Sequence, residues 1–375
     1  MREGDLYEDT RRLAAEAFAP LAESGRPGRV NRALVQSLAE HGLLARLFPT
    51  VSATDLCIIR EALATACTEA ETAFALQGLG AYPILQAGSP ELRERWIPSV
   101  ADGTAIAAFA LTEPEAGSDV SAISLQATQD GDGYRLRGEK LWISNAPEAD
   151  VYTVFARTSE GRRGLTAFAV AGDSQGLTGD HKAMLAAHAI GSLRFEDVYV
   201  SRDCVLGEPG GGFRVAMQTL DLFRPSVGAF AVGMARHALE LAADWALERQ
   251  TFGKPLADHQ AVAHRIAELS ARVEAARLLV RAAAKTHDDG TPDPALAAMA
   301  KLLATETAQE AVDAAVQFHG ARALEQGHPL EHLYREVRAP RIYEGASEIQ
   351  REIIARAVFR EAQARRASQA APGVK

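Results

Sequence analysis

A glutamate near the C-terminal end of the sequence has a setting suited to proton transfer. Glu344 stands between Tyr343 and Gly345 in the segment RIYEGASEIQR, residues 341–351. Gly345 can adopt a φ angle that other residues avoid, and such a corner would aim the carboxylate sideways. A carboxylate held in this way can act as a general base. The alternative is a solvated loop acid, and the residues alone leave both interpretations open.

The residues around this glutamate predict that a helix starts directly after it. Pro340 ends the preceding helical stretch. Ser347, followed three residues later by Gln350, has the spacing of a capping box. We therefore expect Glu344 to lie at the entrance to the last helix.

A second group of polar residues follows an apolar strand in FALTEPEAGSD, residues 109–119. The strand ends at Thr112, and the chain then turns at Pro114 and passes Gly117 and Ser118. Backbone N–H groups and hydroxyls crowded at a strand end can hold a phosphate or the polar edge of a ring. The spacing alone favours the alternative, an ordinary turn with Ser118 or Asp119 as a cap.

A tryptophan and a hydroxyl lie two residues apart in GEKLWISN, residues 138–145. On a regular strand, Trp142 and Ser144 share a face. The indole could then pack against a flat ring while the hydroxyl bonds to its edge. The alternative is a tryptophan in the core.

Polar residues also gather around Phe252 in ERQTFGKPLADHQ, residues 248–260, where a helix end meets a loop. Arg249, Thr251, His259 and Gln260 can present polar groups there, or Arg249 can serve as a C-terminal cap. In VQFHGARALEQG, residues 316–327, Gly320 has the position of the residue that follows a helix C-terminus. No histidine pair has the converging carboxylates or thiols that a metal needs, so we expect no metal site.

The elements that must position these residues change character twice along the chain. Residues 1–105 have apolar residues at helical spacing, residues 106–205 alternate with a period of two, and residues 206–363 return to long, alanine-rich helices. These patterns predict an α+β fold that is mostly α: a helical domain, a small β-barrel domain and a four-helix bundle. The glycine-rich residues 207–213 are interpreted as a linker and residues 364–375 as a flexible tail.

The composition narrows the classes of function. The chain has 375 residues and a formal net charge of −9, which argues against nucleic acid or an anionic membrane as the main partner. Its three cysteines form no CxxC pair, and the N-terminus has no apolar signal segment, so we expect a cytoplasmic protein. No apolar run is long enough for a membrane span. The sequence has no Walker A motif and no nucleophile elbow.

Taken together and in this order, LTEPEAGSD, GEKLWISN, RQTFGKPLADHQ and IYEGASEIQR resemble the motifs of the acyl-CoA dehydrogenase family. The resemblance extends from about residue 10 to about residue 360. It implies a helical domain, a middle β-barrel domain and a C-terminal four-helix bundle. It also implies FAD as cofactor and the oxidation of an acyl thioester to its α,β-enoyl form.

The resemblance assigns roles to matching positions. Glu344 would remove the α-proton as the catalytic base, and flavin N5 would accept the β-hydride. Arg249–Phe252 would reach the flavin of a neighbouring subunit, so the resemblance implies a homodimer or homotetramer. The residues implied in binding FAD are Phe109, Ala110, Leu111, Thr112, Gly117, Ser118, Trp142, Ile143, Ser144, Arg249, Gln250, Thr251, Phe252, His259, Gln260, Gln317, Phe318, Gly320, Ala321, Ala346 and Glu348. Those implied in binding the substrate are Ser118, Leu220, Asp221, Phe223, Arg224, Tyr343 and Gly345.

Some members of the family carry the base on the first long helix of the bundle, and this sequence has Phe223 there, which cannot take a proton. This favours Glu344. The sequence departs from the family pattern at Ser144, Ala321, Ala323 and Ala346. The resemblance leaves open an acyl-CoA or an acyl-carrier-protein substrate, and it implies an acceptor such as an electron-transfer flavoprotein. A flavin-dependent oxidase or monooxygenase on the same fold is the alternative.

Overall fold

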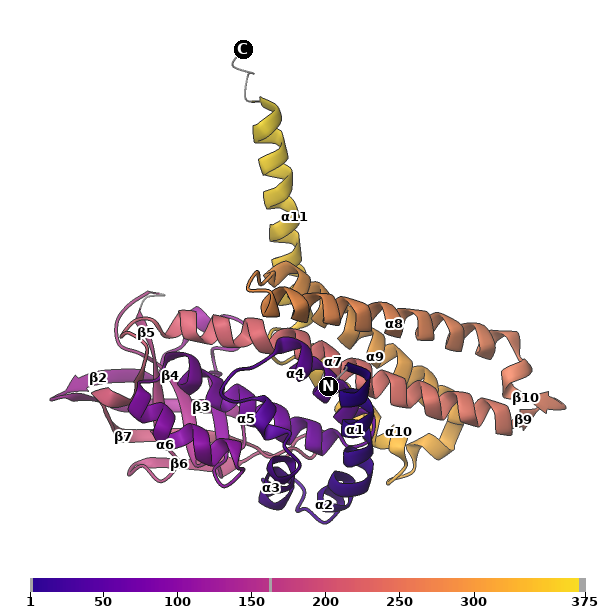
Figure 1. The fold of residues 1–375 in the computed structure, drawn as a ribbon, viewed down its shortest axis with the longest axis horizontal. Coiled ribbons are helices and arrows are strands. Elements are labelled where there is room, and N and C mark those ends of the chain that lie inside the picture. Colours follow the sequence, from indigo (N-terminus) through magenta and orange to yellow (C-terminus); the bar gives the residue numbers. More distant parts are fainter. Residues whose placement is uncertain (1–2, 162–163, 371–375) are drawn as a thin grey trace. The chain divides into compact units, whose positions relative to one another are not determined.

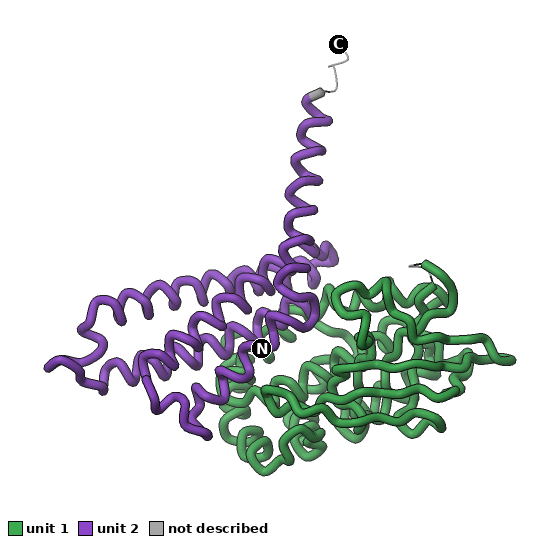
Figure 2. The backbone as a smooth tube through the Cα atoms, turned by 180° about the vertical axis from the view of Figure 1, so that it is seen from behind, with its two compact units in different colours: residues 1–223 green, residues 224–375 purple. Residues whose placement is uncertain are grey.

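The computed structural model describes residues 3–161 and 164–370. The chain forms two compact units, residues 1–223 and residues 224–375, coloured green and purple in Figure 2. One helix, α7 (Gly212–Glu248), begins in the first unit and continues into the second. Within the described ranges, no helix is long and apolar enough to cross a membrane.

The first unit opens with the predicted helices. Side-chain caps start several of them: Asn31 accepts a hydrogen bond from the amide of Leu34, and Ser89 accepts one from the amide of Leu92. The helices are α1 (Glu3–Leu13), α2 (Ala19–Glu23), α3 (Arg32–Glu40), α4 (Ala53–Ala64), α5 (Thr68–Ala87) and α6 (Pro90–Ala101).

A mostly antiparallel sheet follows, with the order β6-β7-β3-β2-β4-β5-β8, and β1 pairs in parallel with β4. The predicted barrel needs correction, because this order is open: β6 and β8 are short edge strands that each bond to one neighbour. The strands are β1 (Ala107–Ala110), β2 (Gln126–Asp130), β3 (Gly133–Ser144), β4 (Val151–Arg157), β5 (Leu165–Ala171), β6 (Leu177–His181), β7 (Ile190–Ser201) and β8 (Val205–Leu206).

Helix α5 packs closely on β1, and a glycine makes this possible. A Cβ atom on Gly80 would lie 2.5 Å from the backbone nitrogen of Ala108. The sequence pattern suggests that Gly80 ends a helix, but Gly80 lies inside α5 and serves this close approach instead. The side chain of Gln77 adds a hydrogen bond of 2.9 Å from the amide of Ala107.

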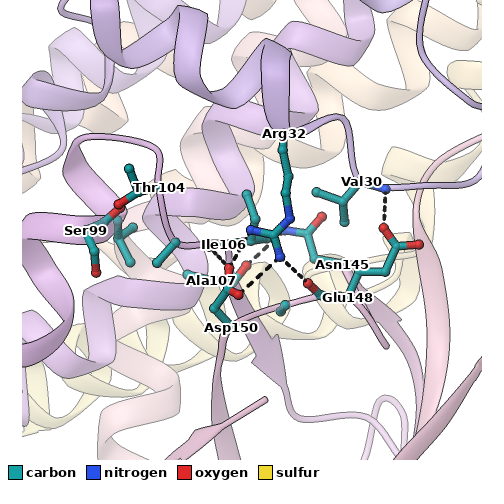
Figure 3. Close-up of polar contacts among 12 residues, drawn as sticks. Val30, Arg32, Ser99, Thr104, Ile106, Ala107, Asn145, Glu148 and Asp150 are labelled. Atoms are coloured by element: carbon teal, nitrogen blue, oxygen red, sulfur yellow. Dashed lines mark hydrogen bonds and ion pairs between the residues drawn. The ribbon is translucent and has the colours of Figure 1, made fainter. Parts of the chain in front are cut away.

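A polar network fixes the start of β1 (Figure 3). The Asp150 carboxylate accepts hydrogen bonds from the Ile106 amide at 2.7 Å and from Arg32 Nη1 at 2.7 Å. The amide group of Asn145, the last residue of GEKLWISN, donates to the carbonyl of Ala107 at 2.9 Å. The strand that leads into TEPEAGSD is therefore held to the end of β3 and the start of β4.

The second unit contains the predicted long helices (Figure 1), and the sequence of α9 is rich in alanine. Gly228 on α7 has no side chain, so Val280 and Ala300 on the neighbouring helices approach closely. The elements are the remainder of α7, β9 (Gln250–Thr251), β10 (Lys254–Pro255), α8 (Gln260–Asp288), α9 (Pro294–His319), α10 (Pro329–Glu336) and α11 (Ser347–Ala370).

Two boundaries in this part differ from the pattern-based expectation. Helix α7 starts at Gly212, within the segment interpreted as a linker, and carries Pro225 in its interior. Helix α11 continues to Ala370, so part of the expected tail is helical. Residues 371–375 of that tail lie outside the described residues.

Candidate active site

The backbone around Glu344 forms a left-handed corner between a short 3₁₀ turn, Ala339–Arg341, and helix α11. Gly345 has a φ of 94°, as the sequence suggests, and Glu344 itself has a φ of 51°. A non-glycine residue in this region costs about 1–2 kcal/mol. Such a conformation persists only where surrounding contacts impose it, and it is typical of functional sites.

Two side-chain donors from different helices hold this corner. Lys301 Nζ on α9 and Gln350 Nε2 on α11 each donate to the carbonyl of Gly345 at 2.8 Å. Gln350 Nε2 also lies 3.3 Å from the carbonyl of Glu344. The predicted capping box does not form. The side chain of Gln350 donates to the carbonyls of the corner, and the Ser347 hydroxyl donates to Glu306 at 2.7 Å.

A charged network anchors the segments on both sides of the corner to α9. Glu306 forms an ion pair with Arg341 at 2.8 Å and lies 3.6 Å from Arg351. Burial raises the pKa of Glu306, but its hydrogen bonds to Ser347 and Arg341 outweigh burial and leave the pKa below its usual value. The Glu306 carboxylate therefore stays ionised and ties the corner to the bundle.

The predicted residues of the second unit that surround the corner do gather there. Tyr343 and Glu348 are exposed, whereas Ala346 is half-buried. The charges of Glu344 and Arg224 both act on Lys301, so Arg224, which is 6% exposed, lies close to the same group. The sequence analysis missed Lys301. Its only signal was a lysine inside the apolar stretch ALAAMAKLLA, residues 295–304.

In the first unit, the structure brings the end of β1 beside β3. Lys140 Nζ donates to the carbonyl of Leu111 at 2.8 Å, and the amide of Leu141 donates to the carbonyl of Thr112 at 3.0 Å. Phe109 packs against Phe155 with ring centroids 5.0 Å apart. Ala110 is buried, whereas Gly117 and Ser118 are exposed in the following turn.

A buried ion pair lies under this turn. Lys140 and Glu113 are 2.9 Å apart, and Glu113 also accepts hydrogen bonds from the amides of Ser124 and Leu125. Burial raises the pKa of Glu113, but Lys140 and these hydrogen bonds outweigh it, so the pKa is lowered. Burial lowers the pKa of Lys140 to about 8, although Glu113 opposes the change.

Trp142 lies at a bulge in β3 and is accessible. The register of β3 against β7 shifts between Lys140 and Ile143, and Trp142 has a φ of 55°. Trp142 is 52% exposed, so it is not the core tryptophan of the alternative interpretation. Ile143, between Trp142 and Ser144, is buried, whereas Ser144 is half-buried.

The chemistry of this donor set fits a polar aromatic ligand. Within residues 3–161 and 164–370, no protein group bonds to the hydroxyls of Thr112, Ser118 or Ser144, or to the indole nitrogen of Trp142. An exposed indole can cover a flat ring, and unbonded hydroxyls can bond to the edge of such a ring. The isoalloxazine of FAD has both features.

The other predicted cofactor residues gather at one end of the second unit. His259 Nε2 donates to the carbonyl of Thr251 at 3.1 Å, and Phe252 is 98% exposed at the tip of the β9–β10 hairpin. Trp245 Nε1 donates to the carbonyl of Phe318 at 3.0 Å, which ties the end of α7 to the end of α9. The remaining predicted residues in residues 249–260 and 317–321 are exposed: Arg249, Gln250, Gln260, Gln317, Gly320 and Ala321.

This second cluster does not meet the Glu344 corner within one copy of the unit. Lys301, which contacts the corner, and His319, at the end of α9, are 18 residues apart on one continuous helix. At 1.5 Å per residue this corresponds to about 27 Å. The resemblance assigns Arg249–Phe252 to the flavin of a neighbouring subunit, and a separation of this size within one copy is compatible with that expectation.

The expected substrate residues on α7 lie on the part of the helix that spans the unit boundary. Leu220 and Phe223 are buried, and Asp221 is half-buried. The ring of Phe223 lies edge-on to Tyr82 with centroids 6.1 Å apart. A Cβ atom on Gly78 would lie 2.9 Å from this ring, so the glycine admits the phenylalanine.

Comparison with known proteins identifies the family. The chain matches the acyl-CoA dehydrogenase N-terminal domain over residues 2–104, the middle domain over 108–198 and the C-terminal domain over 210–359. This chain belongs to the acyl-CoA dehydrogenase family. The acyl-CoA dehydrogenase match covers both described units, and the predicted fold class is confirmed apart from the closed barrel.

Individual relatives agree with this assignment. The acyl-CoA dehydrogenase chain is 36% identical over 369 residues to cyclohexane-1-carbonyl-CoA dehydrogenase of Geobacter metallireducens, which covers 95% of this chain and 97% of the relative. It superposes on butyryl-CoA dehydrogenase of Megasphaera elsdenii with a TM-score of 0.89 and 32% identity, covering 95% and 98% of the two chains. The FAD complex of PigA gives a TM-score of 0.90 at 28% identity, covering 95% and 97%. The chain is thus an FAD-dependent oxidoreductase of the acyl-CoA dehydrogenase type.

Proposed function

We propose that this acyl-CoA dehydrogenase uses Glu344 as the base that removes the α-proton of its acyl thioester. The observation that carries the proposal is the left-handed corner at Glu344 and Gly345, held by Lys301 and Gln350. Two buried donors on one carbonyl are more than a solvated loop acid needs. Phe223, at the alternative position for a base, has no ionisable group.

The chemistry explains why the carboxylate must be held so firmly. A thioester α-hydrogen is weakly acidic, so its removal needs a carboxylate in fixed contact with it and shielded from water. Bound FAD supplies the acceptor for the β-hydride. Glu344 holds the α-proton as a carboxylic acid, and this proton must leave before Glu344 can act as a base in the next turnover.

The residues that would hold the flavin come from both clusters. Trp142 and Ser144 on β3, with Thr112 and Ser118 after β1, offer an accessible ring face and unbonded hydroxyls. The exposed Arg249–Phe252 hairpin and the 317–321 segment would hold the flavin of a second copy, because they lie about 27 Å along α9 from the Glu344 corner. We therefore propose a homo-oligomer, at least a dimer.

The substrate we propose is a CoA thioester with a short or ring-bearing acyl group. Phe223 and Tyr82 pack together beside Gly78, and we take the bulk of these two rings to favour a small acyl group. The names of two relatives, a cyclohexane-1-carbonyl-CoA dehydrogenase and a butyryl-CoA dehydrogenase, support this size range. We also propose a cytoplasmic location and an electron-transfer flavoprotein as acceptor.

A thioester panel tests the proposed substrate. The purified holoenzyme is mixed without oxygen with butyryl-CoA, cyclohexane-1-carbonyl-CoA, palmitoyl-CoA and the butyryl thioester of an acyl-carrier protein, and flavin absorbance is followed. We expect the first two to bleach the flavin fastest. Preference for the carrier-protein thioester would overturn the CoA assignment. Rapid oxygen consumption by the reduced enzyme would instead support an oxidase.

A further inference from the structure

Lys301 is unusual among the charged residues of the second unit because it is completely buried. Lysines are almost never fully buried unless they are paired, since removal of the ammonium group from water is costly. Within residues 3–161 and 164–370, no carboxylate lies within ion-pair distance of Lys301 Nζ, and its hydrogen bond goes to the carbonyl of Gly345. A lysine in this position needs an explanation other than packing.

The bond that Lys301 makes acts directly on the corner. Lys301 comes from α9 and Gln350 from α11, and both donate to the carbonyl of Gly345 at 2.8 Å. Gly345 directly follows Glu344, whose own φ is 51°. Fixing this carbonyl fixes the peptide between Gly345 and Ala346, and Gln350 Nε2 also lies 3.3 Å from the carbonyl of Glu344. The backbone directly after Glu344 is therefore held on both peptides, which restricts the direction in which the side chain of Glu344 leaves the corner.

We propose that Lys301 is a positioning residue of the active site: its ammonium group clamps the Gly345 carbonyl, keeps the corner left-handed, and places a positive charge beside the Glu344 carboxylate. This inference rests on the proposed function of Glu344. Lys301 acts through Glu344 and has no assigned contact with the substrate.

The charges around Lys301 come from several elements. Glu344 lies in the corner, Arg224 on α7, Glu306 on α9 and Glu348 on α11. Burial lowers the pKa of Lys301 to about 8, against the attraction of Glu344, while Arg224 lowers it further. Lys301 is therefore charged below about pH 8, in the range where Glu344 must lose its own proton to become a base.

Lys301→Met tests the inference, because methionine is an unbranched side chain only one atom shorter and removes both the donor and the charge. Lys285→Met is the matched control, since Lys285 is an exposed lysine that pairs with Asp289 at the end of α8. Two quantities are measured on the holoenzyme: hydrogen exchange of residues 342–347, and the anaerobic rate of flavin bleaching by a saturating acyl-CoA as a function of pH.

We expect Lys301→Met to speed hydrogen exchange in residues 342–347 and to slow bleaching about 10- to 100-fold, because a small misplacement of the base is enough for such a loss. We also expect the acidic limb of its rate profile to move about one pH unit upward, since a carboxylate beside a positive charge ionises at lower pH. The substrate concentration for half-maximal bleaching stays close to the wild-type value, and the control matches the wild type in every respect.

Gln350→Met separates the effect of the hydrogen bond to the Gly345 carbonyl from the effect of the positive charge of Lys301. It removes the second donor to the same carbonyl without changing charge, so we expect slower bleaching with the acidic limb unmoved. If Lys301→Met fails to fold, Lys301→Gln takes its place, and we expect the same upward movement of the acidic limb with a smaller loss of rate.

A rate and profile equal to those of the wild type would overturn the inference. A loss of thermal stability with an unmoved acidic limb would also overturn it, because Lys301 would then be structural only. Failure of the proposed function looks different: either the wild-type enzyme would not be bleached by any acyl-CoA in the panel, or Glu344→Gln would be bleached at the wild-type rate.

Discussion

Two buried lysines perform the same task in the two units. Lys140 donates to the carbonyl of Leu111, which precedes the proposed flavin residue Thr112, and Lys301 donates to the carbonyl of Gly345, which follows the proposed base. A lysine side chain can reach a carbonyl from a neighbouring element, and its charge makes the hydrogen bond stronger than a neutral one. In both segments a buried lysine holds a backbone carbonyl in place.

The Lys140–Glu113 pair makes stability depend on pH. The pKa of Lys140 is lowered from 10.5 to about 8, so between these values the unfolded chain binds more protons than the folded one. The contribution of Lys140 to the free energy of unfolding therefore increases as the pH rises from about 8 to about 10.5. We expect the melting temperature of the wild type, relative to Lys140→Met/Glu113→Gln, to rise over this range. A constant or falling difference would contradict the assignment.

Lys140 also permits a direct test of flavin binding. We expect Lys140→Met to lose FAD during gel filtration, because the Leu111 and Thr112 segment is released and Glu113 is left buried without its partner. Lys182→Met, at an exposed lysine, is the control and retains its flavin. Equal flavin content in both variants would show that the Leu111 carbonyl bond is not needed.

At the scale of elements, the packing of α5 on β1 positions the segment that leads to Thr112. The contact depends on Gly80, where a Cβ atom would lie 2.5 Å from the Ala108 nitrogen. Backbone cannot yield as a flexible side chain can, so an added methyl group must move the helix or the strand. The network of Asn145 and Asp150 holds the other side of the same strand (Figure 3).

Gly80→Ala should therefore destabilise the first unit by about 1–3 kcal/mol, the usual cost of overpacking. Gly4→Ala is the matched control, because Gly4 also lies in a helix but has nothing within 4 Å of its Cβ position. We expect the control to change stability by less than about 0.5 kcal/mol. Chemical denaturation followed by circular dichroism measures both variants, and equal midpoints would refute the close approach.

The sequence predicts the order of elements and the residues of each motif, because both depend on local periodicity and composition. It does not predict Lys301, which lies 43 residues before Glu344 and meets the corner only through folding. Gly80 looks like a helix end because its use depends on a strand some 28 residues later. The Ser347–Gln350 spacing marks the helix start correctly, but the neighbouring Glu306 takes the bond expected for the cap.

At the scale of the whole molecule, the separation of the two clusters in the second unit predicts shared sites. Lys301, which holds the Glu344 corner, lies about 27 Å along α9 from His319, at the end of the helix where the Arg249–Phe252 hairpin gathers. Phe252 is 98% exposed at the tip of the hairpin in the single chain, so its ring is accessible to a second copy.

Mixed assemblies test whether two copies build one site. We expect Glu344→Gln and the double variant Arg249→Ala/Phe252→Ala each to have little activity alone. When both are expressed together in equal amounts, about a quarter of the sites regain both sets of wild-type residues, because half of the dimers are mixed and one site in each is intact. No activity in the mixture would argue that each chain completes its own site.

The most direct test of the central claim is a single-turnover measurement on Glu344→Gln. The variant is loaded with FAD and mixed without oxygen with the thioester that bleaches the wild type fastest. Because glutamine is similar in size but cannot take the α-proton, we expect unchanged flavin content and substrate binding, with bleaching slower by a factor of about 10²–10⁴. Bleaching at the wild-type rate would contradict the assignment of Glu344 as the base.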